Sequence, residues 1–329
     1  MAGSGQAKWL TIFVTMTQKI PEVRVPPNTP NRMKHITVCV CTYKRPLLLE
    51  RLLQELDNQD TENLFTYSIV VAENDRSQSA RPVVMKFAAA SKIPVKYCLE
   101  PVQNIALARN RAIENATGDF VAFIDDDEYP AKQWLLFLFK ACDMHGVDGV
   151  LGPVMPLFGY GVPRWIVEGR FYDRPRYPTG VRLDWSQTRT GNVLLKSHLF
   201  AGDAQPFRAQ CLEGSDQEFF KRMMQMGRVF TWYDEAVVHE VVPPQRWTRS
   251  FLIRQALFRG IFSVRNHGFP LPLIATSAIA VPAYALALPL SLLLGQATFM
   301  SYVYRLSYHA GRLLALLGIN PIRQAYVTD

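Results

Sequence analysis

Short apolar segments alternate with helical segments between residues 36 and 124, and this alternation restricts the fold more than any other feature of the chain. Four segments are typical of strands: 36–42, 67–72, 94–99 and 119–124. The first is apolar and rich in β-branched residues, as buried strands are. Three segments typical of helices lie between them: 47–56, about 80–90 and 104–116. Strands that are joined through helices pair in parallel. We therefore predict an α/β fold with a mostly parallel sheet flanked by helices.

Acidic and hydroxyl side chains follow these strands at their carboxyl ends, where ligands bind in such sheets. Thr42 ends the first strand, residues 73–75 follow the second, and residues 125–127 are three consecutive aspartates after the fourth. Adjacent carboxylates repel one another, and a divalent cation would relieve the repulsion. Because all these ligand atoms are oxygens, Mg²⁺ or Mn²⁺ is favoured. The alternative is an acidic turn that caps a helix near Trp134.

The motifs near the first strand exclude two common classes of nucleotide-binding protein. Neither GxxxxGK[ST] nor GxGxxG follows this strand, so a P-loop ATPase and a dinucleotide-dependent dehydrogenase are disfavoured. A cation with few protein ligands commonly bridges a substrate diphosphate, which favours a nucleotide-diphosphate substrate. The net charge of +8 also favours phosphate-bearing partners. Nucleic acid is disfavoured, because the arginines are not interleaved with exposed aromatic residues in a recognisable module.

The C-terminal part is basic and then apolar, which indicates contact with a membrane. Residues 246–268 hold five arginines among aromatic and aliphatic residues. Residues 269–294 carry no charge and are numerous enough to cross a bilayer, but their four prolines argue against a straight helix. Arginines precede and follow this run, so a re-entrant hairpin or a pair of interfacial helices would keep them on one side. A single span and a buried helix of a soluble core are the alternatives.

Several motifs, taken together in their order, resemble glycosyltransferase family 2, whose members have the GT-A fold. They are VCVCTYKRP, VVAEND, NIALARNRAI, TGDFVAFIDDDEYP, EGSDQEFF and VVHEVVP, and the resemblance covers about residues 35–265. Within that family the chain is most similar to bacterial succinoglycan and exopolysaccharide glucosyltransferases. The resemblance implies a nucleotide-sugar donor, a divalent metal, inversion at the anomeric carbon and a carboxylate base.

The resemblance also implies roles for single residues. Those that match the nucleotide-sugar site are Thr42, Arg45, Glu73, Asp75, Arg109, Asp125 and Asp126. Those that match the metal site are Asp125, Asp127 and His239. Without the resemblance, a single histidine in an apolar strand such as AVVHEVVP is more often a core residue than a ligand.

Asp216 matches the general base of the family, although the family often has Glu-Asp where this chain has Ser215 and Asp216. Glu218, near the start of the same predicted helix, is the alternative base. A role as helix cap is also open to Asp216. The acceptor candidates are Trp165, Asn192 and Glu218, and Trp165 could either stack on a sugar ring or pack in the core.

The predicted organisation has four parts: an N-terminal arm (1–33), a GT-A catalytic domain (34–245), a basic amphipathic segment (246–268), and a membrane-associated helical hairpin with a tail (269–329). The apolar run in the arm is too short to span a bilayer. The five cysteines are an odd number without CxxC spacing, which favours a reducing compartment. We expect the protein at the cytoplasmic face of the inner membrane, monotopic or re-entrant.

The sequence therefore predicts an inverting, metal-dependent glycosyltransferase. Its donor would be a nucleotide-diphosphate sugar, UDP-hexose, and its acceptor a hydroxyl of a lipid-linked saccharide in bacterial polysaccharide or glycoconjugate biosynthesis. Two alternatives remain at this point. A nucleotidyltransferase that makes a nucleotide sugar would need no membrane hairpin, and a non-catalytic membrane-bound scaffold that binds a nucleotide sugar would not need Asp216.

Overall fold

The computed structural model describes residues 32–211, 214–267 and 271–319. The chain divides into a short unit, Met1–Arg32, and a large unit, Met33–Asp329. The predicted arm, 1–33, lies outside the described residues apart from its last two, and so does the end of the predicted tail, 320–329.

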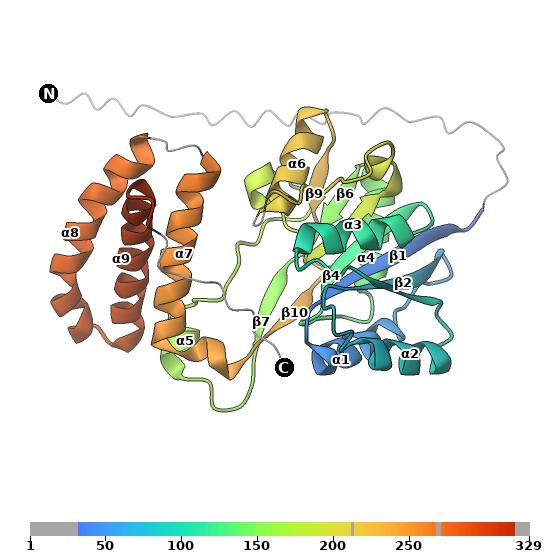
Figure 1. Ribbon diagram of the computed structural model, residues 1–329, viewed down its shortest axis with the longest axis horizontal. Helices are drawn as coiled ribbons and strands as arrows, with labels where there is room; N and C mark the ends of the chain where they lie inside the picture. Colours follow the sequence, from blue (N-terminus) through green and yellow to red (C-terminus); the bar gives the residue numbers. More distant parts are fainter. Residues whose placement is uncertain (1–31, 212–213, 268–270, 320–329) are drawn as a thin grey trace, which may run out of the picture. The chain divides into compact units, whose positions relative to one another are not determined.

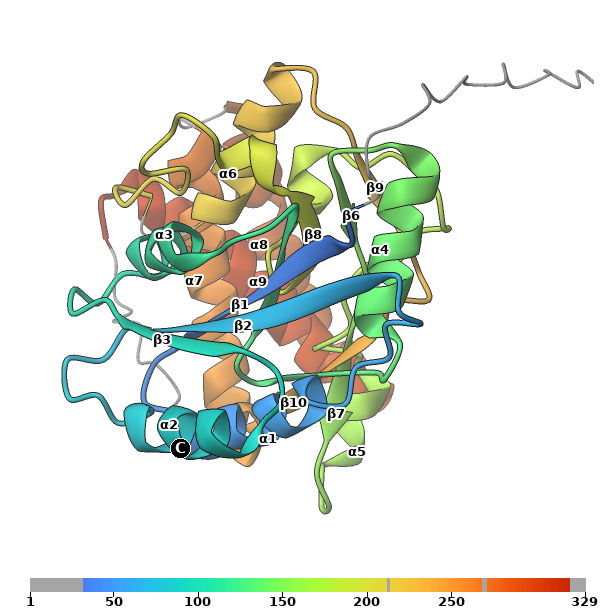
Figure 2. The same ribbon diagram turned by 90° about the vertical axis from the view of Figure 1, so that its right-hand side faces the viewer.

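A seven-stranded sheet with the order β3-β2-β1-β4-β8-β6-β9 forms the centre of the large unit (Figure 2). Its strands are β1 (Lys34–Thr42), β2 (Phe65–Glu73), β3 (Val95–Leu99), β4 (Phe120–Asp125), β6 (Gly149–Leu151), β8 (Asn192–Lys196) and β9 (Phe230–Trp232). β1 pairs in parallel with β2 and β4, and β2 pairs in parallel with β3. β8 is antiparallel to both of its neighbours. The four strands that the sequence predicts are therefore adjacent and parallel.

Helices cover both faces of this sheet, so its central strands are buried on both sides. In β1, Val38 and Val40 belong to one core cluster and Cys39 to the cluster on the other face, as the two-residue period of a strand requires. The first face is covered by α1 (Pro46–Leu56), α2 (Arg81–Ala90) and α4 (Trp134–His145). The second face is covered by α3 (Ile105–Asn115) and α6 (Ser215–Gln225). The predicted α/β architecture is confirmed.

A second sheet of three strands begins directly after the acidic run. Its order is β5-β10-β7, and its strands are β5 (Glu128–Pro130), β7 (Val154–Phe158) and β10 (Val238–Val242). β10 is antiparallel to β5, with Glu240 opposite Glu128 and His239 opposite Tyr129. Directly opposite residues share a face of a sheet. Glu240 and Glu128 are therefore on one face, and His239 is on the other.

Three helices form the C-terminal part: α7 (Arg249–His267), α8 (Leu271–Leu293) and α9 (Gln296–Leu316). α9 packs against both α7 and α8 (Figure 1). We expected the prolines to argue against a straight helix; Pro282 and Pro289 lie inside α8, which is continuous from Leu271 to Leu293. Each proline removes only one backbone donor, and the hydrogen bonds on either side of it maintain the helix.

α8 is the one helix in the described part of the chain whose length and composition would allow it to cross a membrane. Most of its large apolar side chains are exposed: Leu271, Ile279, Leu286, Leu290, Leu292 and Leu293. The other two helices contribute to a buried cluster that joins them to the rest of the unit. In this cluster Leu252 of α7 and Met300 of α9 pack with Trp247 and with Trp165 of α5 (Arg164–Glu168).

Candidate active site

A cavity of about 280 Å³ opens at the carboxyl ends of β1 and β4, where the sequence predicts the ligand site. Three arginines and four carboxylates line it: Arg45, Arg109 and Arg246, with Asp125, Asp126, Asp127 and Glu240. Thr42 and Asn74 also line it. Of the seven residues that match a nucleotide-sugar site, the cavity brings together Thr42, Arg45, Arg109, Asp125 and Asp126.

Thr42 and Arg45 hold the second and third aspartates. The Thr42 hydroxyl donates a hydrogen bond to Asp126 Oδ2 (2.7 Å). Arg45 Nη1 forms ion pairs with Asp126 Oδ1 (2.9 Å) and Asp127 Oδ2 (3.0 Å). The parallel pairing of β1 with β4 sets Cys41 beside Asp125, so the residues that follow β1 reach the acids that follow β4.

Burial and mutual repulsion act on the whole acidic group. Burial raises the pKa of Asp125 and of Asp126 above the ordinary range. Burial and the charges of Asp126 and Glu240 raise the pKa of Asp127 to about 7. Burial and the charge of Asp125 raise the pKa of Glu128 well above its ordinary value. Part of the rise at Asp127 and Glu128 comes from repulsion by neighbouring carboxylates, and a cation would relieve that repulsion.

Glu128 and Asp125 face a small space beside Gly191. Glu128 Oε2 accepts a hydrogen bond from the Asp125 N–H (3.1 Å), while the buried Oε1 has no partner among the described residues. A Cβ on Gly191 would lie 2.7 Å from Glu128 Oε1 and 3.0 Å from Asp125 Oδ2. Both oxygens therefore border the space that the glycine leaves open.

The carboxylate oxygens of Asp125 and Asp127 fit a divalent cation by their chemistry. The side chain of Asp125 forms no ion pair or hydrogen bond with any residue that the structure describes. No group of three His, Cys, Asp or Glu side chains within residues 32–211, 214–267 and 271–319 is arranged to hold a metal by itself. A cation at Asp125 and Asp127 would thus need further ligand atoms from a substrate, as a diphosphate supplies.

Glu73 and Asp75 do not line the cavity, contrary to our expectation for the nucleotide site. Glu73 is buried and accepts hydrogen bonds from the Ala80 N–H (2.7 Å) and the Tyr97 hydroxyl (2.8 Å). Asp75 accepts hydrogen bonds from the serines two and four residues later. These two carboxylates order the turn after β2, and Asn74 between them borders the cavity.

α3 and α6 bring Arg109 next to the predicted base. Arg109 Nη1 donates to the Ser215 hydroxyl (3.1 Å), and Asp216 follows in the first turn of α6. Burial raises the pKa of Asp125, Arg109 counteracts this effect, and Asp216 adds to it. The N-cap position of α6 is occupied by Gly214, so Asp216 is not the cap. The acidic run, Arg109 and Asp216 therefore lie in one neighbourhood.

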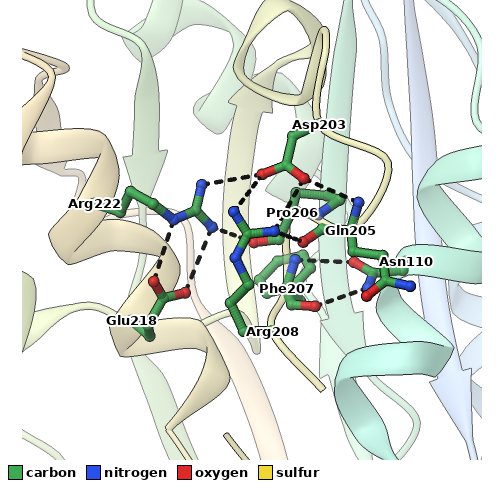
Figure 3. A network of polar contacts seen from close by, with 8 residues as sticks. All are labelled: Asn110, Asp203, Gln205, Pro206, Phe207, Arg208, Glu218 and Arg222. Carbon is green, nitrogen blue, oxygen red and sulfur yellow. Dashed lines mark hydrogen bonds and ion pairs between the residues drawn. The ribbon is translucent and has the colours of Figure 1, made fainter. Parts of the chain in front are cut away.

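Glu218, the alternative base and an acceptor candidate, belongs to an ion-pair network instead. Its carboxylate accepts from Arg222 Nε (3.2 Å), and Arg222 also lies 3.3 Å from Asp203 (Figure 3). Asp203 pairs in turn with Arg208 (2.9 Å). The ion pair with Arg222 engages the carboxylate of Glu218, and this favours Asp216 as the proton acceptor.

His239 is exposed and does not line the cavity, so the structure does not bring it together with the other predicted metal ligands. Glu240 lines the cavity instead and pairs with Arg246 Nη1 (3.0 Å). Successive residues of a strand point to opposite faces, so β10 presents only one of the two to the cavity. The sequence could not reveal which, because valines occur on both sides of this pair at both parities.

Trp165 and Asn192 have structural roles rather than the predicted acceptor role. Trp165 is 9% exposed and packs in the cluster that joins α5 to α7 and α9. Asn192 is 2% exposed, donates to the Pro153 and Ala236 carbonyls (3.0 and 2.7 Å), and accepts from Trp134 Nε1 (2.8 Å). Asn192 thereby fixes the backbone next to Gly191.

The sequence matches the glycosyl transferase family 2 over residues 37–208. It is also 31% identical over 307 residues to the succinoglycan biosynthesis protein ExoM of Rhizobium meliloti, covering 90% of this chain and 97% of that protein. The chain therefore belongs to glycosyltransferase family 2. This membership makes it a glycosyltransferase, and we set aside the nucleotidyltransferase and the scaffold.

Two solved structures share the GT-A fold with this chain. The mannosyltransferase PcManGT of Pyrobaculum calidifontis, in complex with GDP-Man and Mn²⁺, has a TM-score of 0.56 and 19% identity, and the match covers 88% of this chain and 89% of that one. TarS residues 1–349 of S. aureus, in complex with UDP, has a TM-score of 0.51 and 18% identity, with 88% and 94% covered. The GT-A fold that the resemblance implied is confirmed.

Proposed function

We propose that this glycosyltransferase inverts the anomeric centre, uses a divalent cation, and transfers a hexose from a UDP-sugar to a hydroxyl of a lipid-linked saccharide. The observation that carries this proposal is the cavity lined by the acidic run and Arg109, with Asp216 beside the residue that Arg109 contacts, Ser215. A single carboxylate base opposite a diphosphate leaving group is the arrangement that a direct displacement requires.

The donor would occupy the cavity between β1 and β4. Thr42 and Arg45 fix Asp126 and Asp127, so the acidic run keeps its position when charge enters the site. Arg109 lies where its guanidinium can donate to diphosphate oxygens. Bound Mg²⁺ or Mn²⁺, held by Asp125 and Asp127, would supply positive charge to the diphosphate.

In the transfer step, the acceptor hydroxyl gives its proton to Asp216 as its oxygen forms a bond to the sugar C1. The bond between C1 and the diphosphate oxygen breaks, and the nucleoside diphosphate leaves with the electron pair. Arg109 stabilises the negative charge that grows on the leaving group, and stabilisation of charge that appears in the transition state raises the rate. Attack from the opposite side inverts the configuration at C1.

The acceptor and the location follow from the C-terminal helices. The exposed leucines of α8 would be covered by acyl chains if the protein resides on a membrane. Arg254 and Arg259 precede α8, and Arg305 and Arg312 follow it. The preference of arginine for the cytoplasmic side therefore favours an α8–α9 hairpin that enters and leaves from that side. A relative from Campylobacter jejuni, 31% identical over 100 residues, is a GalNAc(5)-diNAcBac-PP-undecaprenol β-1,3-glucosyltransferase.

The test is a donor screen with the purified full chain in detergent micelles. Nucleotide sugars are compared with and without Mn²⁺ or Mg²⁺, and the product linkage is determined by NMR. We expect one UDP-hexose to be used, transfer to cease with EDTA and return with the cation, and the product to have the inverted configuration. Full activity after rigorous chelation would refute the metal requirement, and a retained configuration would refute the single displacement.

A further inference from the structure

Three arginines outside the cavity come from the loop before β8 and from helix α7. Arg174 and Arg189 lie in the long loop between α5 and β8, and Arg259 lies on α7. We call these three residues the arginine cluster. All three residues are partly exposed to solvent, so a ligand could reach them. None of them lines the cavity at the ends of β1 and β4.

Arg189 lies next to the start of α6, where Asp216 is found. The Ser186 carbonyl accepts hydrogen bonds from both Arg189 Nη1 (3.1 Å) and Gln217 Nε2 (3.2 Å), and Gln217 directly follows Asp216. Desolvation lowers the pKa of Arg189, the charge of Asp216 opposes this effect, and the charges of Arg174 and Arg259 add to it. Arg189 is therefore close to the candidate base and to two other guanidinium groups.

The arginine cluster has hydrogen-bond donors that the protein does not use. An arginine side chain carries five N–H donors. Over the ranges that the structure describes, Arg189 donates only to two backbone carbonyls, and Arg259 donates only to the Tyr304 hydroxyl (2.9 Å). Neither forms an ion pair there, whereas Arg174 pairs with Glu240. Phosphate oxygens accept several such donors at once and balance their charge.

The position of the cluster indicates which phosphate it binds. Arg259 belongs to α7, α7 packs on α9, and α9 packs on the apolar helix α8 (Figure 1). Asp216 is therefore followed by the arginine cluster, and the arginine cluster by the apolar helix α8, in the direction from the active site to the C-terminal helices. A lipid-linked saccharide has the matching order of reacting hydroxyl, phosphate and lipid. We propose that Arg174, Arg189 and Arg259 bind the phosphate groups that join the acceptor saccharide to its lipid, an inference that rests on the proposed function.

The test measures binding of farnesyl diphosphate to the full chain in detergent micelles. The chain is first saturated with the nucleoside diphosphate that binds most tightly, so that the donor cavity is filled. Arg189→Ala and Arg259→Ala should each weaken farnesyl diphosphate binding by about 10-fold or more, because each removes charge-assisted hydrogen bonds. Both variants should keep the nucleoside diphosphate affinity of the unaltered chain.

Arg254→Ala is the matched control. Arg254 is an exposed arginine on the same helix as Arg259. Among the residues that the structure describes, it donates only to the Ser250 carbonyl of its own helix. It should leave farnesyl diphosphate binding unchanged. Equal loss in Arg254→Ala would mean that general positive charge is responsible, and unchanged binding in Arg189→Ala and Arg259→Ala would mean that the cluster does not contact the phosphates. Either result overturns the proposal.

Two further measurements separate the possible sources of the phosphate and the possible failures. Flotation with phosphatidylglycerol vesicles should be the same for Arg189→Ala and the unaltered chain. A loss of flotation with intact farnesyl diphosphate binding would reassign the cluster to lipid headgroups and overturn the proposal. If no nucleoside diphosphate binds the unaltered chain, the proposed function fails. The dependence of farnesyl diphosphate binding on Arg189 is measured separately, and it tests the arginine cluster.

Discussion

Asp216 and Glu218 lie two residues apart on α6, yet their surroundings differ. Asp216 is near Arg109 and the acidic run, whereas Glu218 pairs with Arg222. Asp216→Asn should lower kcat by at least about 100-fold, because the amide cannot accept the proton, and nucleotide affinity should change little. Steady-state kinetics and nucleotide titration measure the two effects.

Glu218→Gln is the control for this substitution, since it makes the same chemical change on the same helix. It should weaken the ion pair with Arg222 and retain most of kcat. If Glu218→Gln were inactive and Asp216→Asn active, the base would be Glu218.

Gly191 is the residue whose substitution tests the space beside the acidic run. In Gly191→Ala the new Cβ would meet Glu128 Oε1 at 2.7 Å and Asp125 Oδ2 at 3.0 Å, so both carboxylates must shift. A displacement of about 1 Å near reacting groups can cost about 100-fold in rate, and we expect a loss of that order in transfer. The nearest atom to a Cβ on Gly159 is 3.7 Å away, so Gly159→Ala should be nearly neutral. Equal activity of the two variants would contradict a role for this space.

The sequence identifies the site residues that follow predicted strands and misses those placed by tertiary contacts. Thr42 and Asp125 were predictable because parallel strands end at one edge of a sheet. Glu240 was not, because the face that β10 presents depends on its pairing with β5. Trp165 was ambiguous for a similar reason, since the cluster that covers it includes residues distant in sequence, such as Trp247 and Met300.

At the scale of elements, α7 and α9 approach each other through two glycines. A Cβ on Gly260 would lie 2.0 Å from the Tyr308 carbonyl oxygen, and one on Gly311 would lie 2.2 Å from that of Leu257. These are backbone atoms, so the helices must separate to admit a methyl group. Gly311→Ala should therefore lower the free energy of unfolding by about 1–3 kcal/mol, as overpacking does.

Chemical denaturation in detergent micelles measures this change, with Gly159→Ala as the control. If Gly311→Ala were as stable as the unaltered chain, the close approach of α7 and α9 would be wrong.

The elements that the sequence predicts best are those in which local pattern and tertiary environment agree. Both faces of β1 are apolar and both are covered by helices, so its range was clear. The second sheet was not predicted, because β5 has only three residues and its pairing with β10 joins positions more than a hundred residues apart. α8 was predicted as an apolar run, but its proline content suggested more disruption than the structure has.

For the whole molecule, the exposed leucines of α8 should determine membrane association. Leu286, Leu290 and Leu293 are 80%, 67% and 82% exposed, so replacing all three with Gln should leave the packing against α9 intact. Burying one leucine side chain contributes about 1.5–3 kcal/mol, so the triple variant should float much less with lipid vesicles. Flotation and nucleotide titration are measured together, and nucleotide affinity should not change.

Leu47, on α1, is 69% exposed and serves as the control position, since Leu47→Gln should not alter flotation. Unchanged flotation of the triple variant would show that α8 does not anchor the protein.

The order of the C-terminal helices has a consequence for how the chain is made. α9 lies between α7 and α8 in the packing, yet it is the last of the three to be synthesised. While α9 is still being translated, α8 lacks the helix that it packs on, and its apolar surface is already complete. We therefore expect α8 to meet the bilayer while the ribosome is still attached, so that translation of this protein takes place at the membrane surface.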